Sequence, residues 1–382
     1  MVPLATIVER VTEQAQAESS GEPDLAASLP GNQKKPSKKR LIITTVIGTI
    51  IMIGIFTVIF PKLGDYGQAL EQLKDLPVGW VIALVLAGAL NIFAYPFTVL
   101  VSVPGLKYWP GFIERQVGFL ISCAIPGGGV FAVGAQYRIL SFYKVSPARS
   151  AAAVTADAVW VYLLTLAMPA LSIGLLMIEG RNTAGYGFIA VLGSIAVIIS
   201  VIVIVLTLRS ENGARKVGHF GYRMLNPIMK KLKKPTPDVE GALIDFRVHA
   251  HDLVTTRWKA ITVANAVAQL TPYVVLVCAL GGLGAWPGQL TLIEIFAAYS
   301  VALLLVSIPI SPGGLGTVDL ALVALLTAYG ADGPTAVAAD VLWRVVWFLP
   351  QILAGVASMV AYFFVQRRAD KRAALAGVAN DQ

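Results

Sequence analysis

Residues 290–330 read LTLIEIFAAYSVALLLVSIPISPGGLGTVDLALVALLTAYG, and this stretch decides the fold that the sequence predicts. Two apolar segments flank the break Ser311-Pro312-Gly313-Gly314-Leu315-Gly316. Neither segment reaches the roughly 20 helical residues that cross a bilayer. Proline and glycine interrupt a helix at this point. We therefore expect a re-entrant hairpin, which is two half-helices joined by a turn near the middle of a membrane.

The composition supports a membrane location. Of the 382 residues, 56% are hydrophobic and 14% are charged, and the mean hydropathy is +0.72. Soluble domains carry roughly 25% charged residues. The net charge of +8 is concentrated in short basic stretches beside the apolar runs, as the positive-inside rule expects. This charge therefore does not indicate nucleic-acid binding.

Apolar segments long enough to cross the membrane predict an all-α polytopic protein with about six full spans: 41–60, 78–104, 149–178, 185–208, 258–283 and 335–365. Basic residues before the first span, in the loop 209–257 and after the last span place both termini in the cytoplasm. Counting between these points, the segment 111–142 must begin and end on the cytoplasmic side. Because Pro126-Gly127-Gly128-Gly129 interrupts it, we expect a second re-entrant hairpin there.

The chain divides into three parts by composition. Residues 1–40 are expected to be a disordered basic cytoplasmic tail, and residues 366–382 a second cytoplasmic tail. The transmembrane domain covers 41–365, with halves at 41–178 and 185–365 and the basic cytoplasmic loop 209–257 in the second half.

The two broken regions resemble each other. The first break is followed by Ala156-Asp157-Ala158-Val159-Trp160, and the second by Ala339-Asp340-Val341-Leu342-Trp343, at similar spacing. The predicted topology gives the halves opposite orientation, each with two spans, a hairpin and a span. Inverted repeats with interrupted helices are typical of secondary transporters, whose site lies at the repeat interface near the midplane. Chance similarity between membrane segments is the alternative, but two breaks at membrane depth favour a cavity.

Glycines of the two breaks are candidate ligands of an anion. A half-helix that starts at a glycine motif presents free backbone N–H groups and the positive end of its dipole, which suits a lipid phosphate. The alternative is that the glycines only permit a turn between packed helices. The candidates are Gly127, Gly128, Gly129, Gly313, Gly314 and Gly316.

Charged residues inside the spans mark a pathway or a structural pair. Asp157, Asp340 and Arg344 lie inside spans. Asp157 and Arg344 are expected close to the middle of the bilayer, where a charge costs about 2.5–3.5 kcal/mol on insertion scales. They could face a polar interior and bind substrate. Alternatively, Asp340 could neutralise Arg344 four residues away, or Asp157 could pair with Arg344 across the repeat.

Polar residues near the breaks leave similar alternatives open. Arg138 could clasp a phosphate or place its charge at the interface. Asp319, in the first turn after the second break, could complement the helix dipole or meet a cationic headgroup. Glu294 is expected to be solvated near the outer interface. His249 and His251 could bind a metal, but an amphipathic helix on the membrane surface is the favoured interpretation.

Known chemical motifs are absent from the sequence. It contains no Walker A motif, HExxH motif or dinucleotide fingerprint. Cys123 and Cys278 lie in apolar segments and suggest neither a disulfide nor a metal site. We therefore predict no catalytic residue, metal or cofactor, and expect transport that is downhill or coupled to an ion or to the membrane potential.

Two motifs resemble the lysylphosphatidylglycerol synthase transmembrane region, the flippase-like domain family. The first is Gly134-Ala135-Gln136-Tyr137-Arg138-Ile139-Leu140, followed by Val145-Ser146. The second runs from Ile308 to Gly316 with Asp319, and continues with Leu342-Trp343-Arg344 and Phe348-Leu349-Pro350. The resemblance covers about 41–365. It departs at Asp319, where the family often has Glu, and at Val318, where Arg is common.

The resemblance implies lipid translocation and places Tyr137 and Arg138 among the substrate-binding candidates. The sequence does not include the cytosolic aminoacyl-transferring domain of the bifunctional members, so it implies the flippase-like half without lysyl transfer. The leading hypothesis is flipping of a phospholipid or lipid-linked molecule across the cytoplasmic membrane. The alternatives are a membrane-embedded headgroup or polyprenyl-phosphate transferase, and a non-catalytic partner of envelope-lipid synthesis. A membrane lipid, anionic or aminoacylated, is the expected ligand, and a homo-oligomer or envelope-lipid enzymes are possible protein partners.

Overall fold

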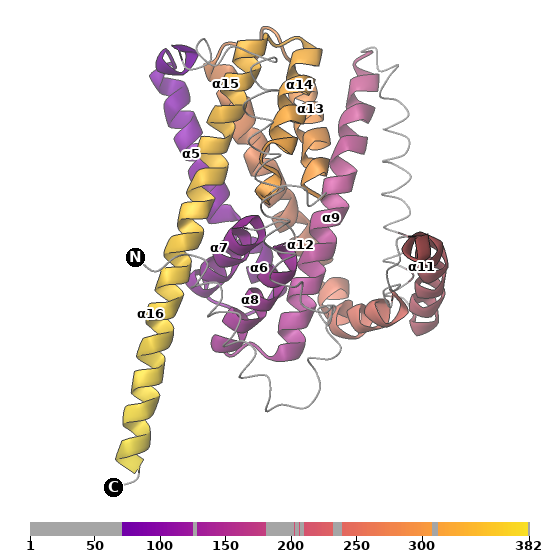
Figure 1. The fold of residues 1–382 in the computed structure, drawn as a ribbon, viewed down its shortest axis with the longest axis vertical. Coiled ribbons are helices and arrows are strands. Elements are labelled where there is room, and N and C mark those ends of the chain that lie inside the picture. Colours follow the sequence, from indigo (N-terminus) through magenta and orange to yellow (C-terminus); the bar gives the residue numbers. More distant parts are fainter. Residues whose placement is uncertain are drawn as a thin grey trace.

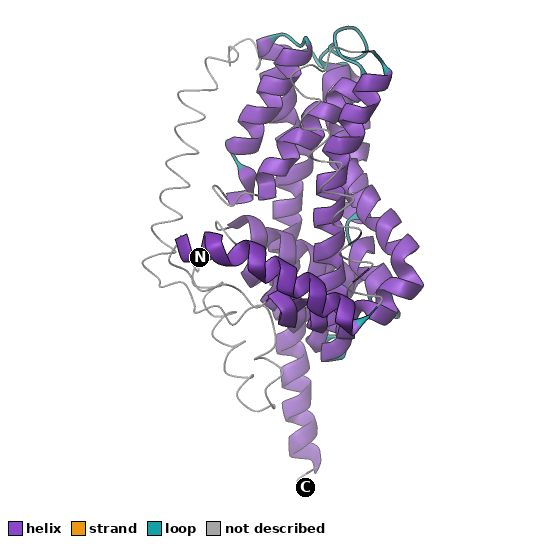
Figure 2. Cartoon of the chain, turned by 90° about the vertical axis from the view of Figure 1, so that its right-hand side faces the viewer, coloured by secondary structure: helices purple, strands orange, loops and turns teal. Residues whose placement is uncertain are grey.

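The computed structural model describes residues 71–124, 128–180, 202, 206, 210–231, 239–307 and 312–380. Within these ranges every regular element is a helix (Figure 2). The elements are α5 Val78–Ala94, α6 Phe97–Ser102, α7 Tyr108–Ala124, α8 Gly129–Phe142, α9 Pro147–Ile178, α11 Glu211–Lys231, α12 Val239–Gly282, α13 Leu292–Leu304, the 3₁₀ turns η4 Leu305–Ser307 and η5 Pro312–Gly314, α14 Thr317–Tyr329, α15 Gly333–Trp343, the π-helical turn η6 Arg344–Phe348, and α16 Leu349–Asn380.

Four stretches of helix are long and apolar enough to cross a membrane: Val78–Ser102, Pro147–Ile178, Ala250–Gly282 and Gly333–Ala369. They correspond to four of the six predicted spans. The predicted span 41–60 lies outside the described residues, as does almost all of 185–208. Large apolar side chains on these helices are exposed, among them Leu86, Val263 and Leu353. Exposed apolar patches of this extent mark a surface that meets lipid or a partner rather than water, so the fold is that of an all-helical, multi-pass membrane protein.

Two pairs of shorter helices pack inside this frame. Helices α7 and α8 contact each other, and so do α13 and α14. Each of the four has 13 to 17 residues, which is shorter than the roughly 20 residues of a full span. The pair α7 and α8 lies in the lower half of the view in Figure 1 and the pair α13 and α14 in the upper half, while the long helices α9, α12 and α16 extend past this division.

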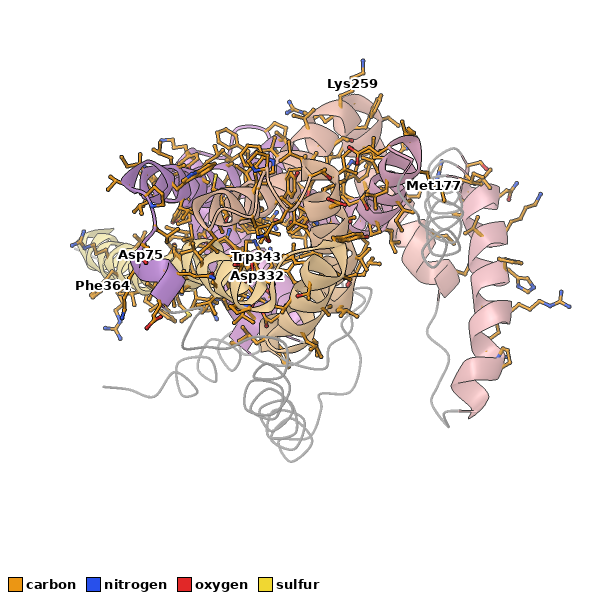
Figure 3. The ribbon with its side chains drawn as sticks, turned by 90° about the horizontal axis from the view of Figure 1, so that it is seen from above. Asp75, Met177, Lys259, Asp332, Trp343 and Phe364 are labelled. Carbon is orange, nitrogen blue, oxygen red and sulfur yellow. The ribbon has the colours of Figure 1, made fainter. Side chains whose placement is uncertain are left out.

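Helix α12 is the centre of the bundle. It contacts α5, α6, α9, α11 and α15, and its apolar residues belong to the largest buried cluster together with those of α13, α14 and α15. Trp343, which is 1% exposed, donates its indole N–H to the carbonyl oxygen of Pro272 on α12, at 2.9 Å. Seen along the bundle, Trp343 lies in the interior, and Lys259 and Phe364 lie at the edge (Figure 3).

The basic segment 209–257 is largely helical. It contains α11 and the first turns of α12, which pack against each other. Helix α11 lies beside the bundle rather than within it (Figure 1). His251 is on α12 in this region, so the expectation of a helix there is confirmed.

Candidate functional site

A cluster of buried charges joins α7 to α9. Arg115 Nη1 lies 2.8 Å from Asp157 Oδ2, and these side chains are 6% and 11% exposed. Glu114, which is 1% exposed, has its Oε2 atom 3.9 Å from Arg115 Nε. The guanidinium also lies 5.3 Å from the ring centroid of Tyr95, at the end of α5. One arginine therefore contacts two carboxyl groups and an aromatic ring.

The sequence analysis identified Asp157 but missed its partners. Glu114, Arg115 and Gln116 are three consecutive polar residues inside the apolar segment that became α7. All three are buried. Because burying ionised groups in a membrane is costly, that run of polar residues was the signal that could have found the cluster.

A second cluster joins α14, α15 and η6. Arg344 donates through Nε to Asp319 Oδ1, and Asp319 is fully buried. The other oxygen of Asp319 accepts the backbone N–H of Gly316, at the start of α14. Asp340, which is 1% exposed, interacts with both Asp319 and Arg344. Asp319 therefore complements the N-terminus of its own helix, and the cation that it meets is an arginine of the protein.

The environment of Arg344 is aromatic and irregular. The guanidinium lies 5.0 Å from the ring centroid of Trp343 and 5.1 Å from that of Phe348. Arg344 begins the π-helical turn inside the last span. Such turns are rare and occur frequently at functional sites.

Both buried ion pairs stay within their own halves of the chain. The pairing of Asp157 with Arg344 that the sequence allowed is therefore wrong, since Asp157 binds Arg115 and Arg344 binds Asp319. The expected solvation of Glu294 is also wrong. Glu294 is 3% exposed and forms a capping box with Thr291 at the start of α13.

The second break has the tight turn that its glycines predict. Gly313, Gly314 and Gly316 have φ angles of 60°, 69° and 84°, in the left-handed region that favours glycine. A Cβ atom added at Gly313 would lie 2.8 Å from Cζ of Phe348 and 3.5 Å from Cβ of Cys123. Cys123 stands at the end of α7, directly before the first break. The turn of the second helix pair therefore packs against the place where the first pair is interrupted.

The two short helices that follow the breaks, α8 and α14, differ at their N-termini. The Gly316 N–H at the start of α14 is bound by Asp319, so the anion-binding role expected there is taken by a carboxylate of the protein. At the start of α8, Gly128 is the N-cap, and no side chain of the described residues caps the helix. A Cβ atom added at Gly129, which opens the helix, would have no described heavy atom within 4 Å beyond its own backbone surroundings. Gly127 lies outside the described residues.

Two further candidates lie on α8. The Tyr137 hydroxyl donates to the carbonyl oxygen of Pro147 at 3.2 Å, which ties α8 to the start of α9. Arg138 is partly buried in the middle of α8.

A buried polar network lies near the first cluster, and the sequence analysis did not anticipate it. Asn91 on α5 donates to Thr271 Oγ1 at 2.7 Å and accepts a hydrogen bond from Gln351 Nε2 at 2.7 Å. Gln116, adjacent to Arg115, donates to the carbonyl oxygen of Ile92, adjacent to Asn91. Buried polar groups therefore continue from the first cluster to the helices α5, α12 and α16.

An apolar groove of about 300 Å³ opens between α5–α6 and α12. Ala94, in the wall of the groove, directly precedes Tyr95, whose ring contacts Arg115. The groove therefore spans the break between α5 and α6, next in the chain to the tyrosine that contacts the first charged cluster. Its lining residues are Ala94, Phe97, Val101, Ala260, Val263, Ala264 and Val267.

These observations define a multi-pass helical membrane protein that holds ionisable side chains and interrupted helices inside its bundle. The family model for the lysylphosphatidylglycerol synthase TM region matches residues 45–355, and the chain belongs to that family. The resemblance drawn from the two sequence motifs is thereby confirmed. No curated protein matches the chain.

Proposed function

We propose that this protein moves a phospholipid or lipid-linked molecule between the leaflets of the cytoplasmic membrane. In this proposal α7–α8 and α13–α14 are re-entrant hairpins of an inverted repeat, and the substrate headgroup passes between them near the midplane. The protein acts as a transporter rather than as a chemical catalyst. Membership of the family, which is associated with membrane lipids, supports the class of substrate.

The contact between the second break and the end of α7, which precedes the first break, is the observation that carries the proposal. Gly313 packs against Cys123, and each helix pair contributes a buried charged cluster. Interrupted backbone and ionised side chains are tolerated at membrane depth only where protein or a water-filled cavity surrounds them. Two such regions meeting inside one bundle match the central site of transporters with inverted repeats.

Equivalent tryptophans support the repeat. Trp160 donates its indole N–H to Thr262 Oγ1 at 2.8 Å, and Trp343 donates to the Pro272 carbonyl. Both acceptors are on α12, although the tryptophans come from opposite halves of the chain. A tryptophan three residues after the aspartate of each Ala-Asp motif therefore binds the same helix.

The positions of the cytoplasmic candidates support the topology. In Figure 1 the loop after α8 and helix α11 lie at the level of the lower half of the bundle, and the C-terminal end of α16 extends below it. The turn before α15 lies at the upper end. We propose that the lower end is cytoplasmic, with both termini on that side, since it carries the basic segments.

Substrate contacts follow from the open features of the site. The start of α8 offers backbone N–H groups that no described side chain caps to a phosphate, with Gly127, Gly128 and Gly129 allowing close approach and Tyr137 and Arg138 on the same helix. The apolar groove beside Tyr95 accommodates an acyl chain. Arg344, Asp340 and Asp157 form the polar walls, and Gly313, Gly314, Gly316 and Asp319 shape the opposite turn.

Lipid translocation in proteoliposomes tests the proposal. Vesicles would carry headgroup-labelled phosphatidylglycerol, its lysyl form or a neutral lipid, and reagent accessibility of the label would report movement. We expect transport by the native protein, and its loss in Arg344→Ala and Asp157→Asn. Arg215→Ala is the matched control, because Arg215 is exposed on α11. Folded protein that moves none of the lipids, or Arg344→Ala with native rates, contradicts the proposal.

A further inference from the structure

Each charged cluster holds two carboxyl groups for one guanidinium. In the second cluster, Arg344 is the one cation among the described residues that acts on Asp319 and Asp340. With both carboxyls ionised, this cluster carries a net charge of −1 in the interior of the bundle. An uncompensated buried charge is strongly disfavoured, and such a group neutralises itself instead.

The hydrogen bonds show which carboxyl is left over. Asp319 uses one oxygen to accept from Arg344 and the other to accept from Gly316. An ionised carboxylate, which only accepts hydrogen bonds, satisfies both contacts. Asp340 is 1% exposed, and its Oδ1 atom has no hydrogen-bond partner among the described residues. Its neighbours are the already engaged carboxylate and the arginine, so Asp340 is the group that lacks a counter-charge in this part of the chain.

We propose that Asp340 is a proton-binding site within the membrane, and that binding of an anionic lipid headgroup to Arg344 strengthens proton binding at Asp340. This inference rests on the proposed function. It adds the ion that would be coupled to lipid movement.

Linkage gives the direction of the coupling. Arg344 Nη2 is buried without a hydrogen-bond partner in the described part of the chain, which leaves a donor for a phosphate oxygen. A phosphate that shares the guanidinium weakens its compensation of the two carboxyls, so the proton on Asp340 is held more tightly. By reciprocity, protonated Asp340 also favours binding of the anionic headgroup.

Charged groups that act on Asp340 come from the helices packed against α15. These helices are α12, α14 and η6. Across the ranges that the structure describes, Asp319 from α14 and Arg344 from η6 are the charged groups that act on Asp340, and α12 contributes none. A proton fits this setting better than a metal cation, because an arginine beside the carboxyls repels a metal.

Infrared spectroscopy of the full chain in vesicles tests the inference without any transport assay. A protonated carboxyl has a carbonyl stretching band that is distinct from carboxylate bands and shifts in D₂O. We expect Asp340→Asn to remove a component of this band at neutral pH and Asp340→Glu to retain one. Asp252→Asn is the matched control, because Asp252 is exposed on α12.

The coupling is measured by titrating that band in vesicles of phosphatidylcholine and of phosphatidylglycerol. We expect phosphatidylglycerol to raise proton affinity at Asp340 by between about 5- and 150-fold. Anionic vesicles also lower the surface pH, so the shift is compared with that of Arg344→Ala in the same vesicles, where only the surface effect remains.

Three outcomes overturn the inference: an unchanged band in Asp340→Asn, a band that appears only when Na⁺ is removed, or equal lipid-dependent shifts in the native chain and Arg344→Ala. The proposed function fails separately. In that case vesicles show no lipid translocation, although the Asp340 band and its lipid-dependent shift are present.

Discussion

Removing Arg115 should destabilise the protein far more than removing its partner Asp157. The Arg115→Leu substitution leaves the carboxyl groups of Asp157 and Glu114 buried without the cation that they share. Breaking a buried pair in this way costs about 3–5 kcal/mol of unfolding free energy. In Asp157→Asn the guanidinium keeps Glu114 and the ring of Tyr95, so the loss is about 1–3 kcal/mol.

The double variant distinguishes charge compensation from packing. Apolar replacement of both partners of a buried ion pair is often neutral or stabilising. We therefore expect Arg115→Leu combined with Asp157→Leu to be more stable than Arg115→Leu alone. Reversible unfolding in detergent, followed by tryptophan fluorescence, gives the free energy of unfolding for each variant.

A surface pair provides the control. Arg215 and Glu211 are joined at 2.8 Å, but their side chains are 56% and 53% exposed. We expect Arg215→Leu to leave the free energy of unfolding nearly unchanged, because water and salt screen an exposed ion pair. If Arg115→Leu costs no more than Arg215→Leu, or if the two substitutions in the first cluster are simply additive, the reasoning about the buried cluster is refuted.

Three further predictions concern single positions. Gly313→Ala should lower stability and abolish lipid translocation, because its Cβ would press on Phe348. Gly129→Ala, at a helical position with open space, should be stable. Equal stabilities of the two variants in thermal unfolding would contradict this prediction. Asn91→Ala removes the buried hydrogen bonds to Thr271 on α12 and Gln351 on α16 and should cost about 1–3 kcal/mol. The same unfolding experiment measures this loss, and an unchanged stability would contradict the role of the network. Trp343→Phe removes one buried hydrogen bond and should cost about 1 kcal/mol or more, and a neutral result would mean that the indole N–H does not anchor α12.

Local patterns predicted the elements well where the signal was contiguous. The break at 311–316 was visible because proline and glycine interrupt an apolar run, and the structure places three glycines there at positive φ. The buried charges Asp157, Asp340 and Arg344 stood out because ionised residues are rare in spans. Their partners were not predictable in the same way. Arg115 lies 42 residues from Asp157, and Arg344 pairs with Asp319, 25 residues away, rather than with the neighbour one turn back.

The sequence by itself determined a polytopic helical membrane protein, its family, the place of both interruptions and the residues that carry unusual charge. Hydrophobic length, glycine and proline act locally, so their effects can be predicted along the chain. Only the tertiary structure decided that the second interruption packs against the end of α7, that Asn91 joins residues 180 and 260 positions away, and that each cluster has two carboxyls for one arginine. Those facts depend on which helix faces pack together, and packing at such separations is set by the whole bundle rather than by any local pattern.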